Sequence, residues 1–182
     1  MDEIELHLIE RVKEDPATFG TVYEHYVDRI YNYMYQRTRN QHDAEDLTSR
    51  VFYRALKNVG RYRVQGAPFG SWLYRIAHNV VANWYRDSKR RKTVSVDSLA
   101  PIESVDVRPE EVAEQAEEVR LLWQAIGQLN PDRQELLILK FSEGLSNAEI
   151  GQIMSRTEGA VKALYHRTLQ GLRKELAKTL ER

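Results

Sequence analysis

The stretch LSNAEIGQIMSRTEGAVKALYHRTLQGLRK, residues 145–174, predicts two helices separated by a tight turn. Ser146 and Glu149 have the spacing of a capping box, in which each side chain satisfies an unpaired backbone N–H at a helix start. Ile150 and Ile153 supply the buried side of this first helix. Thr157, a residue type that caps helices, opens the second one. The pattern is that of a helix-turn-helix.

The second helix has two unlike faces. An inward stripe at helical spacing is formed by Val161, Leu164, Leu172 and Leu176. The opposite face carries Lys162, Ala163, His166, Arg167 and Gln170. Such a face suits a helix that reaches phosphates and base edges in a major groove. An ordinary helical hairpin with solvated charges is the alternative, because short motifs also occur by chance.

Composition narrows the function class. The chain has 182 residues and no cysteine, which excludes disulfides and thiolate metal sites. Its apolar content suffices for one or two cores, which favours two domains of below-average size. Neither a signal peptide nor a long apolar span occurs, so we expect a cytoplasmic protein without membrane insertion.

The formal net charge of zero hides a strong segregation of charge along the chain. Residues 61–92 carry eight Lys and Arg against Asp87 alone, a charge of +7, whereas residues 93–118 carry Arg108 against eight acids, a charge of −7. Residues 156–182 come to +4. Two basic blocks separated by an acidic one favour two nucleic-acid surfaces on one chain, although charge runs are often only solvated faces.

Aromatic residues lie within and beside the first basic block, where unpaired bases could stack on them. They are Tyr62, Phe69, Trp72, Tyr74, Trp84 and Tyr85. Some of these rings belong to a core. Trp72 and Trp84 share a helical stripe with Leu73, Ile76 and Val80, so we expect both to pack inward at least in part.

Caps and prolines divide the first half of the chain into helices. Asp15-Pro16 starts a helix that should run over residues 16–38. Asp43 is expected to open a second helix that ends near residues 58–60. After an aperiodic loop at residues 61–67, Pro68 starts a third that reaches about Lys92.

The rest of the chain reads as a linker and a second bundle. Residues 93–112 lack a sustained period and form an acidic linker. The bundle begins near Glu111 and restarts at Asn130-Pro131, another cap followed by proline. No strand pattern occurs, so the predicted fold class is all-α: two small helical domains joined by an acidic linker, the second a helix-turn-helix.

Three stretches in this order resemble the extracytoplasmic-function (ECF, group IV) sigma factors of the sigma-70 family. DAEDLTSRVFYRAL, residues 43–56, is similar to the family's polymerase-binding helix. FGSWLYRIAHN, residues 69–79, is similar to its strand-opening helix, which reads the minus-10 element. Residues 129–141 and the helix-turn-helix are similar to its minus-35 domain. The likeness covers nearly the whole chain.

The resemblance implies a transcription initiation factor, not an enzyme, that brings core RNA polymerase to particular promoters and captures the melted minus-10 strand. It divides the chain into residues 1–92, a linker at 93–112, and 113–182. Contacts to polymerase are implied for Asp43, Glu45, Asp46, Thr48, Arg50 and Arg54. Arg50 departs from the family, which often has Gln-Glu where this chain has Ser49-Arg50, so details of that interface cannot be carried over.

For the minus-10 element, the resemblance implies that the loop at residues 61–68 holds a flipped base, whose extrusion costs a few kcal/mol. The implied contacts are Arg61, Arg63, Gln65, Phe69, Arg75, His78, Asn79, Asn83 and Arg86. Asn83 stands where relatives often carry an acid, so base preference cannot be carried over.

For the minus-35 element, the implied contacts are Arg156, Thr157, Lys162, Ala163, His166 and Arg167. The acidic linker would thread the polymerase cleft as a mimic of nucleic acid, or serve only as a tether. The resemblance also implies sequestration by an anti-sigma factor.

Two other functions fit parts of the sequence. A stand-alone helix-turn-helix regulator would account for the C-terminal half but not for residues 43–86. A metal-dependent enzyme could be imagined from His42, Asp43, Glu45 and Asp46, but the other histidines show no paired metal spacing with them. We therefore expect no metal, no cofactor and no catalytic residue.

Overall fold

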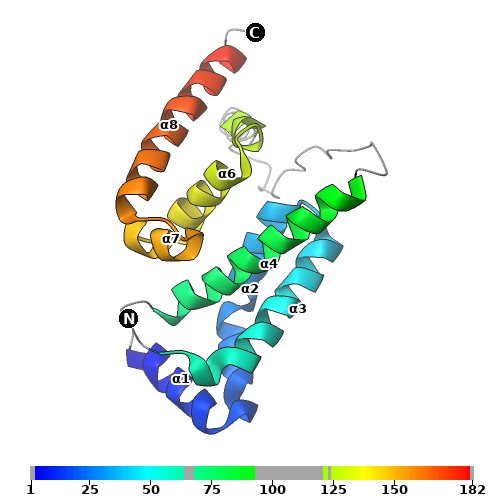
Figure 1. Ribbon diagram of the computed structural model, residues 1–182, viewed down its shortest axis with the longest axis vertical. Coiled ribbons are helices and arrows are strands. Elements are labelled where there is room, and N and C mark those ends of the chain that lie inside the picture. Colours follow the sequence, from blue (N-terminus) through cyan, green and yellow to red (C-terminus); the bar gives the residue numbers. More distant parts are fainter. Residues whose placement is uncertain (1–2, 64–67, 93–120, 123, 181–182) are drawn as a thin grey trace, which may run out of the picture.

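The computed structural model describes residues 3–63, 68–92, 121–122 and 124–180. All regular structure in these residues is helical, so the predicted all-α class is confirmed (Figure 1). The predicted linker at 93–112, the start of the bundle near Glu111 and the candidate contact Gln65 lie outside the described residues.

The N-terminal half consists of helices α1 to α4. Helix α1 spans Glu3–Glu14 and was not expected from the sequence, α2 spans Phe19–Thr38, α3 spans Gln41–Asn58 and α4 spans Phe69–Lys92. Single 3₁₀ turns at Pro16–Thr18 and Val59–Arg61 join them. The helix predicted from residue 16 therefore begins with a 3₁₀ turn, in which the Asp15 carboxylate accepts a hydrogen bond from the Ala17 N–H at 3.0 Å.

The N-cap of α3 was predicted three residues too late. Asn40, not Asp43, is the N-cap, and its side-chain oxygen accepts a hydrogen bond from the Asp43 N–H at 2.9 Å. Asp43 instead lies in the first turn, where its carboxylate interacts favourably with the positive end of the helix dipole.

Large aromatic and aliphatic side chains fill the core between α2, α3 and α4. Tyr33, Met34, Leu47, Phe69 and Leu73 are all at most 1% exposed. The prediction for both tryptophans is confirmed, because Trp72 and Trp84 are partly buried against this core. The ring of Trp72 packs on those of Tyr62 and Phe69, with centroids 5.3 and 5.1 Å apart.

The C-terminal half contains the predicted helix-turn-helix. Asn130 caps α6, which spans Pro131–Leu137 and continues into a π-helical turn at Ile138–Ser142. Helices α7, Asn147–Met154, and α8, Glu158–Leu180, follow. The capping box is confirmed: the Ser146 N–H donates to Glu149 Oε2 at 2.8 Å, and the Glu149 N–H donates to Ser146 Oγ at 3.3 Å.

The two halves pack against each other. Helix α7 lies against α4, and Figure 1 shows the C-terminal helices beside the N-terminal ones. Buried residues of α6, α7 and α8, among them Leu136, Ile150 and Val161, join the same apolar cluster as the core of the N-terminal half.

Gly151 determines the tight turn between α7 and α8. A Cβ at this position would lie 2.6 Å from the backbone oxygen of Arg156, a distance that real Cβ atoms do not show. The chain reverses there through Ser155, which has a left-handed conformation with φ of 55° and caps α7.

We therefore expect Gly151→Ala to destabilise the fold by about 1–3 kcal/mol, because the turn has to widen to admit the methyl group. The matched control is Gly159→Ala in α8, where a Cβ meets nothing within 4 Å. That change should be neutral or stabilising by up to about 1 kcal/mol. Chemical denaturation followed by circular dichroism measures both; equal stability of the two variants would contradict the assigned role of Gly151.

Candidate nucleic-acid and polymerase interfaces

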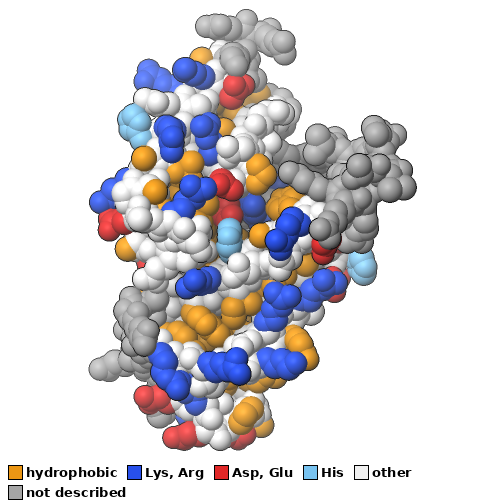
Figure 2. All heavy atoms as spheres, in the orientation of Figure 1, with side chains coloured by type: hydrophobic (Ala, Val, Ile, Leu, Met, Phe, Trp, Pro, Cys, Tyr) orange, Lys and Arg blue, Asp and Glu red, His pale blue; other side chains and the backbone are white. Residues whose placement is uncertain are grey.

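The recognition face of α8 is open to solvent. Every residue expected there, namely Arg156, Thr157, Lys162, Ala163, His166 and Arg167, is exposed. Figure 2 shows basic side chains along α8 and also over the part of the molecule formed by α3 and α4. The Thr157 hydroxyl accepts the Ala160 N–H at 3.2 Å, which confirms Thr157 as a cap.

Two cations of this face are held by neighbouring acids. Lys162 Nζ lies 2.7 Å from Glu158 Oε1, one helical turn away, and Arg156 is paired with Asp132 of α6. Both pairs are at least one-third exposed, and exposed ion pairs contribute only roughly 0–1 kcal/mol. These cations can therefore exchange their carboxylates for phosphates at little cost.

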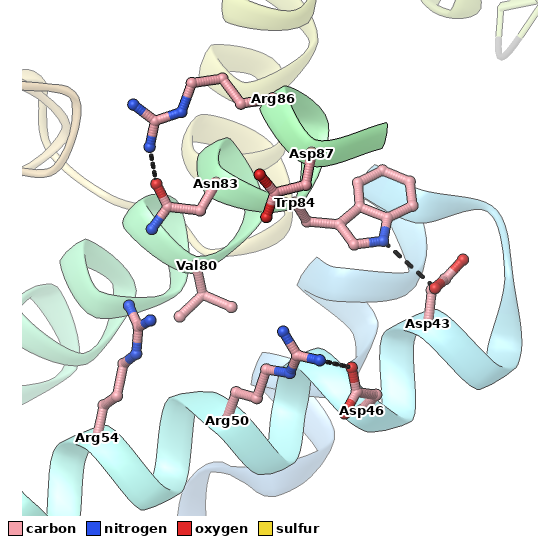
Figure 3. Close-up of a pocket in the computed structure, with 9 residues that line it drawn as sticks. All are labelled: Asp43, Asp46, Arg50, Arg54, Val80, Asn83, Trp84, Arg86 and Asp87. Carbon is pink, nitrogen blue, oxygen red and sulfur yellow. Dashed lines mark hydrogen bonds and ion pairs between the residues drawn. The ribbon is translucent and has the colours of Figure 1, made fainter. Parts of the chain in front are cut away.

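A polar groove of about 560 Å³ runs between α3 and α4 (Figure 3). Its lining residues are Asp43, Asp46, Arg50, Arg54, Val80, Asn83, Trp84, Arg86 and Asp87. The groove brings together residues from two groups for which the resemblance implied different partners, polymerase and the minus-10 strand. Four expected polymerase contacts line it from α3, and two expected minus-10 contacts, Asn83 and Arg86, line it from α4.

Polar contacts order the walls of this groove. Trp84 Nε1 donates to Asp43 Oδ1 at 3.3 Å, which ties the two helices together. Arg50 Nη2 lies 2.8 Å from Asp46 Oδ2, so the charge that departs from the family pattern is paired within its own helix. Asn83 accepts a hydrogen bond from Arg86.

Two expected contacts do not lie on the surface. Thr48 is only 5% exposed and Phe69 is fully buried. The Phe69 ring packs edge-on against Tyr62, with centroids 5.3 Å apart, and therefore supports the aromatic cluster instead of offering a stacking face. By contrast, Glu45, Asp46, Arg50 and Arg54 on α3 and Arg61, Arg63, Arg75, Asn79 and Arg86 of the minus-10 set are exposed.

His78, also expected to contact the minus-10 strand, lies instead in a polar cluster between the two halves. Its Nδ1 is 2.6 Å from Oε1 of Glu135, a residue of α6. The Tyr33 hydroxyl donates to the same oxygen at 2.6 Å, and Arg37 Nη2 lies 3.7 Å from Oε2. Arg37 also donates to the Pro131 carbonyl at 2.8 Å.

This cluster keeps Glu135 ionised. Burial alone would raise the pKa of Glu135, but the hydrogen bond from His78, the charge of Arg37 and the hydrogen bond from Tyr33 hold it below its ordinary value of 4.5. Burial, followed by the charge of Glu135, raises the pKa of Tyr33 well above 10, so the hydroxyl stays a donor.

Glu135 is not among the site residues predicted from the sequence. The one local signal of a buried acid was its position in the sequence, directly before the apolar run Leu136-Leu137-Ile138-Leu139. Its partners lie 57 to 102 residues away in the chain, so no local pattern could identify them.

Comparisons with known proteins agree with this arrangement of helices. The Sigma-70 region 2 family model matches residues 22–91, and the Sigma-70 region 4 model matches residues 120–172. The ECF RNA polymerase sigma factor SigW of Bacillus subtilis is 30% identical over 185 aligned residues, which cover 95% of this chain and 98% of that protein.

The chain belongs to the ECF RNA polymerase sigma factors. The ECF sigma factor BldN of Streptomyces coelicolor is 38% identical over 92% of the chain, which spans 64% of the length of BldN. A sigma factor RpoE solved in complex with the anti-sigma factor NepR from Bartonella quintana has a TM-score of 0.68 at 21% identity, covering 87% of this chain and 96% of that one, and shares the fold.

Membership of the family makes this sigma factor a protein of transcription initiation and not an enzyme. Family membership therefore rules out the hypothesis of a metal-dependent enzyme. Among the described residues, no helix is long and apolar enough to cross a membrane.

The lowered pKa of Glu135 predicts how acid affects the sigma factor. A depressed pKa in the folded state contributes stability that is present above pH 4.5 and is lost as the pH falls through the folded-state pKa. Glu135→Gln removes this contribution. We therefore expect the difference in thermal midpoint between wild type and Glu135→Gln to shrink as the pH is lowered below 4.5. A difference that stays constant with pH would contradict the assigned ionisation.

Proposed function

We propose that this sigma factor divides its work between two domains: residues 1–92 bind core RNA polymerase and capture the minus-10 strand, and residues 113–182 read the minus-35 element. The observation that carries the proposal is the separation of the exposed basic surfaces. One lies on α8, and the other follows the exposed residues Arg61, Arg63, Arg75 and Arg86 before and along α4.

Helix α3 is the proposed polymerase contact. Its exposed charges are acidic at Glu45 and Asp46 and basic at Arg50 and Arg54, so α3 offers both signs to a partner surface. Asp43 accepts the hydrogen bond from Trp84 in the groove. Charges arranged in this way favour the docking of a complementary charged surface and fix its orientation. Thr48 acts from within, as part of the packing that holds α3.

The minus-10 strand is proposed to run along the loop at residues 61–68 and the exposed side of α4. Arg61 and Arg63 would hold phosphates near a flipped base, and Arg75, Asn79, Asn83 and Arg86 would contact the neighbouring nucleotides. Phe69 would support this loop from the core, since its ring is buried.

The minus-35 element is proposed to bind α8 in its major groove. Lys162 and Arg167 are the best candidates for phosphate or base contacts, with Ala163 and His166 on the same face and Arg156 and Thr157 beside the backbone. The partners proposed for this sigma factor are core RNA polymerase, promoter DNA and an anti-sigma factor. The proposed place of action is the cytoplasm.

Run-off transcription on a library of randomised promoters tests this assignment. With core RNA polymerase added, the sigma factor should enrich two elements at a fixed spacing. Arg61→Ala should lose the downstream element selectively, and Arg167→Ala the upstream one. Binding of duplex DNA without any redirection of polymerase would favour the stand-alone regulator.

Arg54→Glu is expected to weaken binding to core polymerase about tenfold or more, because it reverses a charge on the docking helix. The matched control is Arg11→Glu, the same exchange at an exposed position of α1. Fluorescence anisotropy with labelled sigma factor measures both affinities. Equal affinities for the two variants would remove α3 from the interface.

Lys162→Ala is expected to flatten the log–log dependence of upstream-element affinity on salt by about 0.9, the value for one phosphate contact. Lys57→Ala, which removes an equal charge from α3, is the control and should leave the slope unchanged. If both slopes match wild type, Lys162 does not bind a phosphate.

A further inference from the structure

An acidic side chain lies on the face of α8 that is proposed to bind DNA. Glu158 is the first residue of α8 and is exposed. Lys162 and His166 follow at four-residue steps and are also exposed, so the three side chains share one face of the helix. The contacts that the family resemblance implies for this face are basic, small or polar, and Glu158 is not one of them.

The carboxylate of Glu158 points along this face and not back toward the start of the helix. Its Oε1 lies 2.7 Å from Lys162 Nζ, one turn further along α8. Another group caps the start of α8, since the Thr157 hydroxyl accepts the Ala160 N–H at 3.2 Å. Electrostatics at the helix start therefore do not explain the direction of the Glu158 side chain.

A carboxylate at this place opposes the binding of duplex DNA in general. Phosphates repel it, and its pairing with Lys162 is weak, because the two side chains are 50% and 62% exposed. In the proposed complex Lys162 exchanges this carboxylate for a phosphate. Glu158 then has no cation beside it, and a charge held against DNA in this way lowers affinity unless a hydrogen-bond donor replaces the ammonium group.

The major groove supplies such a donor on only some bases. Cytosine presents its N4 amino group and adenine its N6 amino group, whereas guanine and thymine present keto oxygens. The N7 acceptor of adenine lies beside its amino group and repels a carboxylate, whereas cytosine presents no acceptor at this edge. Side chains at the N-terminal end of a recognition helix are the ones that reach base edges. The position and chemistry of Glu158 therefore match cytosine.

We propose that Glu158 determines specificity for one base pair of the upstream element: it releases Lys162 to the DNA backbone and accepts a hydrogen bond from the amino group of a cytosine. This inference rests on the proposed binding of α8 to the minus-35 element. Glu158 acts by rejection as well as by attraction, because a guanine or thymine at this position sets a keto oxygen against the carboxylate. Lys162 is a positioning residue for Glu158 in the free protein and a phosphate contact in the complex.

The first test is run-off selection on randomised promoters by core RNA polymerase carrying the whole sigma factor. In wild type, we expect one position of the upstream element to select cytosine. Glu158→Ala should make this position degenerate and leave the other positions unchanged. Glu158→Gln should move its preference toward adenine, because glutamine pairs with both N6 and N7 of that base. The matched control is Glu10→Ala, which removes an equal charge from an exposed position of α1 and should select as wild type does.

The second test separates base reading from a role in holding Lys162. Fluorescence anisotropy measures binding of the polymerase complex to an upstream duplex that has either the selected cytosine or thymine at the one position. The change of base should weaken wild type about tenfold or more, as one mismatched pair does, and Glu158→Ala less than about threefold. Comparing these ratios removes the general gain in affinity that the loss of a negative charge produces. Lys162→Ala should bind both duplexes more weakly and keep the tenfold ratio.

The outcomes distinguish this inference from the function on which it rests. Equal ratios for wild type and Glu158→Ala would overturn the proposal, and so would loss of the ratio in Lys162→Ala, because Glu158 would then act only through that cation. An unchanged selection by Glu158→Gln would contradict it as well. Continued enrichment of the downstream element shows that each variant folds and binds polymerase. A wild type that enriches no upstream element would instead overturn the proposed function of α8 itself.

Discussion

A buried carboxylate needs charged and hydrogen-bonding partners, and this requirement fixes how the two halves of this sigma factor pack. Glu135 is 2% exposed, and an ionised group at that depth is tolerated only when charges and hydrogen bonds surround it. Its partners come from two helices, Tyr33 and Arg37 from α2 and His78 from α4. All of them meet Glu135 only when α6 lies across both helices in one register. In the same arrangement, Glu143 accepts hydrogen bonds from Arg29 and Tyr74, and Glu149 accepts one from Ser71.

The starts of several helices could be predicted from the sequence because the capping interactions that produce them join residues only a few positions apart. Asp15, Asn130 and the Ser146 and Glu149 pair cap helices whose N–H groups are two or three positions away. The start of α3 was misjudged because Asn40 and Asp43 are both cap-type residues and only the structure shows which one accepts. The interface was not predictable: Tyr33 and Glu135 stand 102 residues apart, and no periodicity links them. The family resemblance implied direct contacts to partners for Thr48 and Phe69, but both side chains are buried. Their burial depends on packing between helices, which the helix propensity of single residues does not describe.

Helix α4 carries more than one task on its surface, and the tasks are divided by direction around the helix. Ser71, Tyr74 and His78 face the C-terminal half, Arg75 and Asn79 face solvent, and Val80, Asn83 and Trp84 face α3 across the groove. The side of α4 that faces α3 connects the proposed strand contacts to the proposed polymerase contacts through the hydrogen bond from Trp84 to Asp43. A partner bound to α3 would therefore act on the same helix that the strand follows, without any need for a long pathway through the core.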